Sequence, residues 1–374
     1  MENVSETILD DAVRPPKFRG GDAFVRLVRA RVAQRLAGRT GRGDQRLCRK
    51  AAIVLVWFVL SYACVLAAPN TWIYVAASLS WAVAAAALAF NIFHDANHGA
   101  FSSDEWVNVW VSRLACAALG VGRHFWRQKH HPMHHQFVNV LEWDDDLESR
   151  GWLRLSPEQP WAPRYRWQYL FFLPLYALNS LEWIAFQDFV KYFTRMTNKY
   201  RPIVPMTRGD KLEFWCTKLI YVGLFVIPPF FMQPLGRVII GFLVFHSVLS
   251  VLLTVTQLAH LNDQTVFSVN NEPGVREEDW GSHQMRATVN FAVDNPVATW
   301  FLGGLNFQIE HHLFPSISHT HYPEISEVVR EVAGEFGLPY RDRASLSAAI
   351  GSHHRLLRAL AVRPSAAPPS GVAA

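Results

Sequence analysis

Histidines gather in three short stretches of this chain, at spacings that suit metal coordination. The sequence has 374 residues and 16 histidines, of which seven lie between residues 94 and 135 and four between residues 311 and 321. The three stretches read HDANH from residue 94, HHPMHH from residue 130 and QIEHH from residue 308. Neutral imidazole binds Fe, Cu, Zn and Ni, so these residues predict a transition-metal site without choosing the metal.

The spacing within the stretches indicates more than one metal ion. His94 and His98 are four residues apart and would share one face of a helix. Adjacent histidines point about 100° apart on a helix, so the pairs at 134–135 and 311–312 suit two ions. For any single pair, the alternative is a helix cap or an exposed polar turn. The candidate ligands are His94, His98, His130, His131, His134, His135, His260, His311 and His312.

Carboxylates and further histidines lie beside these candidates. We expect Asp95 and Glu310 to orient imidazole N–H groups rather than bind metal, with a helix cap or a surface charge as the alternative. For the three aspartates at 144–146, a cap or a surface charge is the preferred interpretation. His319 and His321 either belong to the site or are surface residues.

Four apolar segments are long enough to cross a membrane. They cover residues 51–68, 71–93, 214–232 and 235–259. Each is close to the roughly 20 residues that span about 30 Å of hydrocarbon, and a proline-containing turn joins each successive pair. The sequence therefore predicts two transmembrane hairpins. His246 lies in the middle of the last segment, too far along the helix from His260 to share its metal, and is expected to be buried and hydrogen-bonded.

Two other apolar stretches do not fit a simple crossing. Residues 107–120 are interrupted by Arg113 and are too short to span, so we expect a re-entrant or interfacial helix. Residues 168–188 are long enough but carry Asn179, Glu182, Gln187 and Asp188, and they are flanked by the second histidine stretch and a basic loop. Both flanks are predicted to be cytoplasmic, so this segment should lie in the interface or dip in and return.

Charge predicts the orientation. The first fifty residues hold 12 Lys and Arg against 6 Asp and Glu, directly before the first apolar segment. This pattern favours a cytoplasmic segment next to a membrane over a nucleic-acid surface. With four crossings, all three histidine stretches and His260 then lie on the cytoplasmic side. So many imidazoles on one side of one helical bundle predict a dinuclear metal site.

The predicted fold is an all-α integral membrane protein. It has four transmembrane helices in two hairpins, interfacial helices and a cytosolic, histidine-rich helical cap that includes an amphipathic helix at 323–336. Residues 1–50 form a basic cytosolic segment and 51–345 the membrane domain with the metal site. Residues 346–374 are expected to form a C-terminal helix and a disordered tail.

These stretches together resemble the three histidine boxes of the membrane fatty acid desaturase family. The resemblance is carried by HDANHGAF, WRQKHHPMHH and GGLNFQIEHHLFPSISHTHYPEI, within a region from about residue 51 to residue 340. Gln308 stands where many members have histidine. This feature is similar to the front-end and linoleoyl-CoA-type branch, here in a bacterial form without a fused cytochrome b5 domain.

The resemblance implies a non-haem centre of two iron ions that uses O2 to remove two hydrogens from a fatty acyl chain. It assigns metal binding to His94 and His98 of the first box, His134 and His135 of the second, His311 and His312 of the third, and His260. Either His130 or His131 completes the second box, and the preceding WRQK favours His130. Gln308 then occupies a ligand position, beside the metal, without binding it tightly.

The resemblance also implies partners and alternatives. The substrate would be an acyl chain on CoA, a lipid or a carrier protein. Because no HPGG haem motif is present, electrons would come from a separate ferredoxin, flavodoxin or cytochrome b5, docking on residues 19–50 or 191–211. The expected location is a bacterial inner membrane, with the site facing the cytoplasm. Alternatives are a hydroxylase or ketolase with the same site, or a membrane zinc hydrolase.

Overall fold

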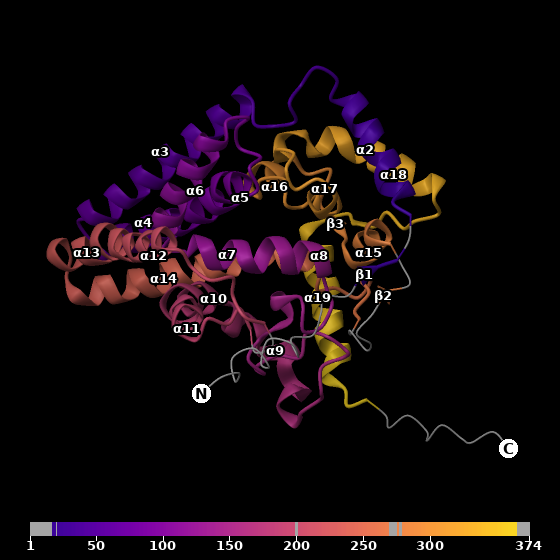
Figure 1. Cartoon of the computed structure of the whole chain (residues 1–374). Helices are drawn as coiled ribbons and strands as arrows, with labels where there is room; N and C mark the ends of the chain where they lie inside the picture. Colours follow the sequence, from indigo (N-terminus) through magenta and orange to yellow (C-terminus); the bar gives the residue numbers. More distant parts are fainter. Residues whose placement is uncertain (1–16, 20, 199–200, 269–274, 277–278, 365–374) are drawn as a thin grey trace, which may run out of the picture.

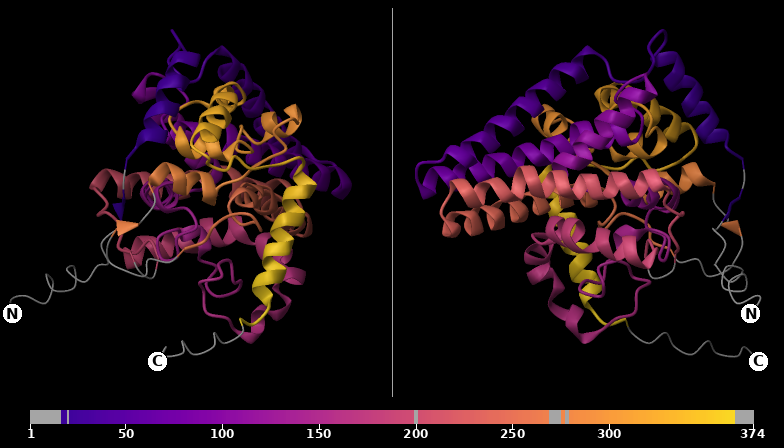
Figure 2. Two further views of the ribbon diagram at one scale, coloured as in Figure 1. Left: turned by 90° about the vertical axis from the view of Figure 1, so that its right-hand side faces the viewer. Right: turned by 60° about the vertical axis from the view of Figure 1, so that its left-hand side comes forward.

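A computed structural model describes residues 17–364 apart from 20, 199–200, 269–274 and 277–278, and within these ranges the regular secondary structure is almost entirely helical. Two short parallel strand pairs accompany the helices. They are β1 (Lys17–Phe18) with β2 (Val275–Arg276) and β3 (Asn290–Phe291) with β4 (Asp342–Arg343). The long helices extend to one side of the molecule and shorter helices fill the other (Figures 1 and 2). The predicted fold class is confirmed.

The four predicted crossings are present as long apolar helices. They are α3 (Gln45–Ala67); α4 (Thr71–Leu88) continued by η1 (Ala89–Phe93) and α5 (His94–Asn97); α12 (Arg208–Tyr221) continued by η6 (Val222–Val226) and α13 (Ile227–Met232); and α14 (Leu235–Thr254) continued by η7 (Val255–Ala259). Large apolar side chains on them are exposed, including 60% of Val59, 68% of Leu219 and 85% of Phe231. An apolar surface of this extent indicates contact with lipid, as expected of a multi-pass membrane protein.

Helix α4 lies in the middle of the membrane part, packed against both α3 and α14. Its second half is a run of alanines, and those from Ala84 to Ala87 are fully buried. Such small side chains let neighbouring helices approach closely in a membrane. The helix continues through η1 into α5, so it delivers His94 to the buried junction between the membrane part and the cap.

The remaining apolar stretches form shorter helices. Helix α6 (Glu105–Leu119) has 15 residues, about 22 Å of helix and too short to span. What we call the bent segment begins with η4 (Pro163–Trp167) and α9 (Gln168–Tyr176), turns by 70°, and continues as α10 (Asn179–Glu182), η5 (Trp183–Gln187) and α11 (Asp188–Thr194). A broken span and a re-entrant loop both have this geometry, so its depth in the membrane stays a prediction.

The cap consists of short helices that pack around the ends of the crossings. They are α2 (Ala23–Arg35), α7 (Arg123–Lys129), η2 (His130–His134), α8 (His135–Phe137), η3 (Asp145–Leu147), α15 (Trp280–Ala287), α16 (Pro296–Phe301), α17 (Gln308–Leu313), η8 (His319–His321), α18 (Tyr322–Glu335) and α19 (Leu346–Ala361). Helix α18 is the predicted amphipathic helix, and its Ile325 and Val329 are buried in one cluster with Val28 of α2. Glutamates of α18 also form ion pairs with Arg31, Arg35 and Arg39, so these arginines of the basic segment bind the cap.

Helix α19 is the predicted C-terminal helix, and it packs against α9 of the bent segment. Gln168 of α9 donates a hydrogen bond to the carbonyl of Leu357, and Arg154 donates one to that of Leu360. The predicted tail from residue 365 onward lies outside the described residues. The proposed domain boundaries remain predictions.

Candidate metal centre

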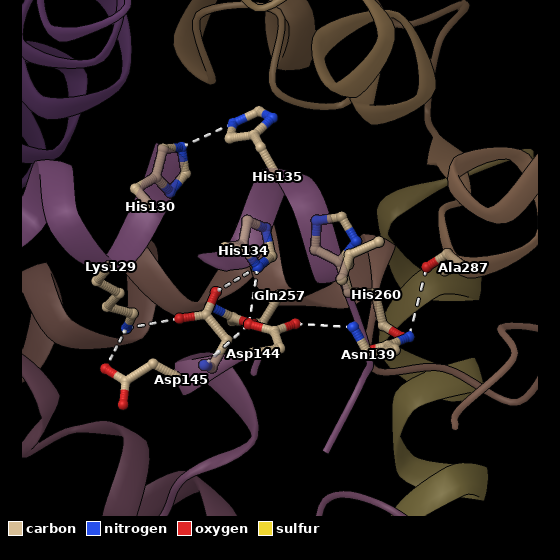
Figure 3. Close-up of polar contacts among 12 residues, drawn as sticks. Lys129, His130, His134, His135, Asn139, Asp144, Asp145, Gln257, His260 and Ala287 are labelled. Carbon is tan, nitrogen blue, oxygen red and sulfur yellow. Dashed lines mark hydrogen bonds and ion pairs between the residues drawn. The ribbon is translucent and has the colours of Figure 1, made fainter. Parts of the chain in front are cut away.

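A π-helical turn carries the second histidine box. In η2 (His130–His134) the backbone N–H of His135 donates to the carbonyl of His130, five residues earlier. Pro132 lies inside this turn and has no N–H to donate to an α-helical ladder. One π turn places residues five apart on the same side, so His130 and His135 face each other, with their Nε2 atoms 3.1 Å apart (Figure 3). An α-helix, as expected here from the sequence, would have aligned His130 with His134.

Seven of the nine candidate ligands fall into two buried groups. In each group, one nitrogen from every ring lies within 4.8 Å of the others. The first group comprises His94, His98, His130 and His311. The second comprises His134, His260 and His312. The rings come from the ends of α4 and α14, from the α7–α8 region and from α17, so distant parts of the chain converge at one place.

His135 and His131 take different positions relative to these groups. The ring centroid of His135 is 4.6 Å from that of His311 and 4.5 Å from that of His312, so His135 lies between the groups. His131 is half-buried and its ring is 4.5 Å from that of His98, at the edge of the first group. Of the two alternatives in the second box, His130 is therefore the one that joins a group.

Electrostatics keep most of these rings neutral. Burial and then the neighbouring histidines hold the pKa of His98, His130 and His311 well below the ordinary value. The pKa of His260 is lowered to about 3 by the same two causes. A neutral imidazole keeps the lone pair that a metal needs.

His134 is the exception, and it has anionic neighbours. Burial alone would lower its pKa, but Asp144 and Asp146 outweigh that effect and raise it. The Nδ1 atom of His134 lies 3.0 Å from a carboxylate oxygen of Asp144 (Figure 3). Asp144 also caps the short helix η3. The expectation of a cap at the aspartate run is thus correct, whereas that of a surface charge is wrong, because Asp144 is only 3% exposed.

Two further ligand candidates have hydrogen-bond partners that the sequence analysis missed. Nδ1 of His312 lies 2.9 Å from the amide oxygen of Gln284, and Nδ1 of His311 lies 3.1 Å from the hydroxyl of Tyr322. Contacts of this kind fix the ring orientation and leave Nε2 to face a metal. Gln284 and Tyr322 are not histidines and lie outside HDANH, HHPMHH and QIEHH, so histidine spacing gave no signal for either.

Asp95, Gln308 and Glu310 are all buried near the centre, and the two carboxylates have different partners from those expected. Asp95 accepts from His319, not from a ring of the two groups. Glu310 accepts from Asn290 and Tyr340, neither of which is a histidine, and burial raises its pKa to about 7. The side chain of Gln308 contacts His260 in the second group.

His319 and His321 are not surface residues. They are 3% and 2% exposed. His319 lies between Asp95 and Lys50, with its Nε2 atom 2.9 Å from the ammonium nitrogen. His246, as expected, is buried and hydrogen-bonded, through Nδ1 to the hydroxyl of Ser180.

Several buried ring nitrogens of the centre have no hydrogen-bond partner in the part of the chain that the structure describes. They are Nε2 of His98, His131, His311 and His312, and Nδ1 of His135 and His260. A buried polar atom without a partner is unfavourable unless something else binds it. Lone pairs converging in a buried space are what transition-metal ions require.

A cavity of about 1240 Å³ adjoins the centre and is lined by five of its histidines, including His94, His130 and His311. Phe93 and other buried apolar side chains surround its inner part, and exposed residues such as Trp152 lie at its rim. The cavity could therefore hold a long apolar chain against the centre. Phe125 and Trp126 also line the cavity, whereas Phe307 packs in the cap.

The chain is similar to known enzymes over most of its length. The fatty acid desaturase family model matches residues 69–344. The chain is 33% identical over 355 residues to an sn-1 linoleoyl-lipid 6-desaturase of Synechocystis sp., covering 92% of this chain and 97% of the relative. A linoleoyl-lipid 6-desaturase of Arthrospira platensis is 30% identical, with 86% and 88% covered.

A eukaryotic relative extends the same pattern. The acyl-lipid (8-3)-desaturase of Mortierella alpina is 30% identical over 301 residues, which are 79% of this chain and 67% of that protein. The family model covers three of the four crossings and all three histidine boxes. The chain belongs to the fatty acid desaturase family and is an oxidoreductase of that class.

Proposed function

We propose that this protein introduces a double bond into an acyl chain of a membrane lipid, using O2 and external electrons at a pair of iron ions. The names of its relatives specify lipid-linked acyl chains. The observation that carries the proposal is the convergence of two buried groups of imidazoles on the wall of one largely apolar cavity. Family membership favours desaturation over hydroxylation, ketone formation or zinc-dependent hydrolysis.

The ligand assignment follows the two groups. His94, His98, His130 and His311 would hold one iron, and His134, His260 and His312 the other. His135 would bind between them, and His131 would support the first group from its edge. The unpartnered ring nitrogens, and the lowered pKa values of His311 and His312, support this fit, because each ligand must offer a lone pair.

The chain's own residues supply binding, orientation and exclusion of water. When bound, an iron pair of this type activates O2 strongly enough to oxidise unactivated C–H bonds. The apolar inner part of the cavity would hold the acyl chain and keep water away from the reacting carbons. Asp144, Gln284 and Tyr322 hold three of the imidazoles in fixed orientations.

The electrons would come from a separate ferredoxin, flavodoxin or cytochrome b5, delivered from the cytoplasmic side of a bacterial inner membrane. Within the basic loop at 191–211, Lys191 is buried and paired with Asp145, so it is a poor docking residue. Arg195, Arg208 and Lys211 are exposed. Reversing these three charges should slow reduction by an acidic donor and leave the iron content unchanged; unchanged reduction rates would exclude this loop as the docking site.

The function is tested by expression in a host with an electron donor, followed by lipid analysis. The full chain should produce new unsaturated acyl chains and purify with two irons per molecule. His312→Ala should produce none, while the matched variant His354→Ala, on α19 away from the centre, should behave as the parent. Hydroxylated products would instead indicate a hydroxylase, and one zinc without iron would indicate a hydrolase; either result would overturn the proposal.

A further inference from the structure

A buried ion pair ties α12, the bent segment and the turn between α6 and α7 together. Lys218 of α12 and Asp188 of α11 are 6% and 0% exposed, and their charged groups are 2.7 Å apart. The ammonium also donates to the carbonyls of Gly120, at 2.7 Å, and Ile184, at 2.8 Å. All three of its hydrogens therefore have acceptors. We call Lys218, Asp188 and the backbone groups they bind the clasp.

The clasp provides hydrogen-bond partners for the backbone of the turn between α6 and α7, from residues outside that turn. Lys218 binds the carbonyl of Gly120, just beyond the end of α6, and Asp188 accepts from the N–H of Gly122, just before α7 begins, at 2.7 Å. Helix ends have such free backbone groups and are usually capped by local residues. Gly120 has φ of +72°, and a Cβ there would lie 2.8 Å from the ring of Tyr221, so the turn is also in close contact with α12.

The parts held by the clasp form a wall of the cavity. Leu119 and Val121, on either side of Gly120, line it, and so does Ile184, whose carbonyl accepts from Lys218. Helix α7 leads from the clasped turn directly into His130 (Figure 1). The clasp therefore holds both a wall of the cavity and the start of the helix that carries the second histidine box.

We infer that Lys218 and Asp188 are positioning residues that determine which carbons of the acyl chain reach the metal centre. The inference rests on the proposed function, because it requires an acyl chain in this cavity. A desaturase must hold two neighbouring C–H groups next to its oxidant while the rest of the chain extends past. The distance between the wall at Leu119, Val121 and Ile184 and the histidines opposite sets that register.

Stability alone is a weak reason for this ion pair. Well-packed apolar residues usually replace a buried ion pair at little or no cost in stability, so such a pair is better explained by what it specifies. Placement errors near 1 Å can change a rate by about 100-fold, which makes a rigid wall valuable in a reaction that chooses among similar methylene groups. The bent segment has a second polar anchor, where Ser180 binds His246 of α14, so it is fixed at two points.

The test lengthens one side chain of the clasp while keeping its charge. Asp188→Glu preserves the ion pair but moves the carboxylate by one methylene, which should displace the turn. We expect the variant protein to accumulate normally and to bind as much iron as the parent. Roughly one tenth or more of its product should carry the double bond at a different carbon. The matched variant Asp342→Glu, in an exposed ion pair with Arg330, should leave the double-bond position unchanged.

The product isomers decide between positioning and mere support. A supporting role would lower the total product without moving the double bond, and that result with Asp188→Glu would overturn the inference. If Asp188→Glu does not accumulate, Val121→Ala decides: the isomer distribution must change, and an unchanged distribution would overturn the inference. If the parent chain itself makes no unsaturated product, the proposed function fails instead, so the two failures are distinguishable.

Discussion

Buried histidines occur in two settings in this molecule, and they differ in how their ring nitrogens are used. Outside the centre, both ring nitrogens of His353 and of His319 have hydrogen-bond partners. His353 binds the carbonyl of Leu261 and the hydroxyl of Tyr176, and His319 lies between Asp95 and Lys50. Inside the centre, the Nδ1 atoms of His311 and His312 have partners, but their Nε2 atoms have none among the described residues.

The difference separates His311 and His312 from His319 and His353. Burial is equal in the two settings, since His311 and His353 are each 1% exposed. Burying a polar nitrogen without a partner costs about 1–3 kcal/mol, so several together would not persist unless a ligand compensated for them. An unpartnered nitrogen directed at other unpartnered nitrogens is therefore better evidence for a metal than burial or sequence spacing.

The largest expected effect comes from one conservative substitution made in both settings. His311→Gln removes a ring nitrogen that faces the centre and should reduce unsaturated product below detection, together with the iron content. His353→Gln can still donate to Leu261 and should retain most of the activity. Lipid analysis and iron content of both variants provide the measurement. Similar losses in the two would show that the unpartnered nitrogens do not identify the ligands.

Acid should destabilise α19 through His353, a buried histidine outside the centre. Burial lowers its pKa to about 4, so between that value and the ordinary 6.5 the unfolded form binds more protons than the folded one. Stability of the packed α19 is then complete above pH 6.5 and is lost as pH falls toward 4, by at most about 3 kcal/mol. Hydrogen exchange of α19 across this range should show the loss, and His353→Gln should flatten it. An equally steep pH dependence in the variant would assign the effect to another group.

Much of the fold followed from sequence because its signals are local. The four crossings were predicted from runs of apolar residues, and the helices begin up to six residues earlier than predicted, at Gln45 and Arg208, because polar first turns continue the same helices. The amphipathic helix α18 agrees with its prediction within a residue at each end. The π turn in the second box was not predicted, because Pro132 alone does not distinguish a kink from a change of helix type.

The histidine boxes were located from local spacing in the sequence. The residues that support their side chains could not be located in this way. Gln284 is 28 residues from His312, and Asp188 is 30 residues from Lys218. Such partners are brought together by packing, and no repeating pattern in the sequence marks them. The surface-charge alternative for the aspartate run was wrong for a related reason, since a local charge cluster does not reveal that Asp144 faces His134 across a turn.

Iron should stabilise the centre because its nitrogens gain partners. Binding to the folded form alone adds about 2.7 kcal/mol when free metal is 100 times the dissociation constant. The metal-free parent should therefore melt at a higher temperature on addition of Fe(II), in detergent and without O2. The melting temperature of His312→Ala should rise less on addition of Fe(II), and that of His353→Gln should rise as much as that of the parent. An equal gain in all three would indicate that iron binds elsewhere.

The smallest expected effects concern Gln284 and Tyr322, which support histidines of the centre. Gln284 supports it twice, through Nδ1 of His312 and through the carbonyl of His135, to which it donates at 3.1 Å. Tyr322 supports it once, at His311. Loss of such a supporting contact lowers metal affinity by about 10- to 100-fold. The loss of iron affinity should therefore be near the upper end of this range in Gln284→Ala and near the lower end in Tyr322→Phe. Iron titration of both variants measures the order, and a larger loss in Tyr322→Phe would mean that ring orientation at His311 matters more than the number of contacts.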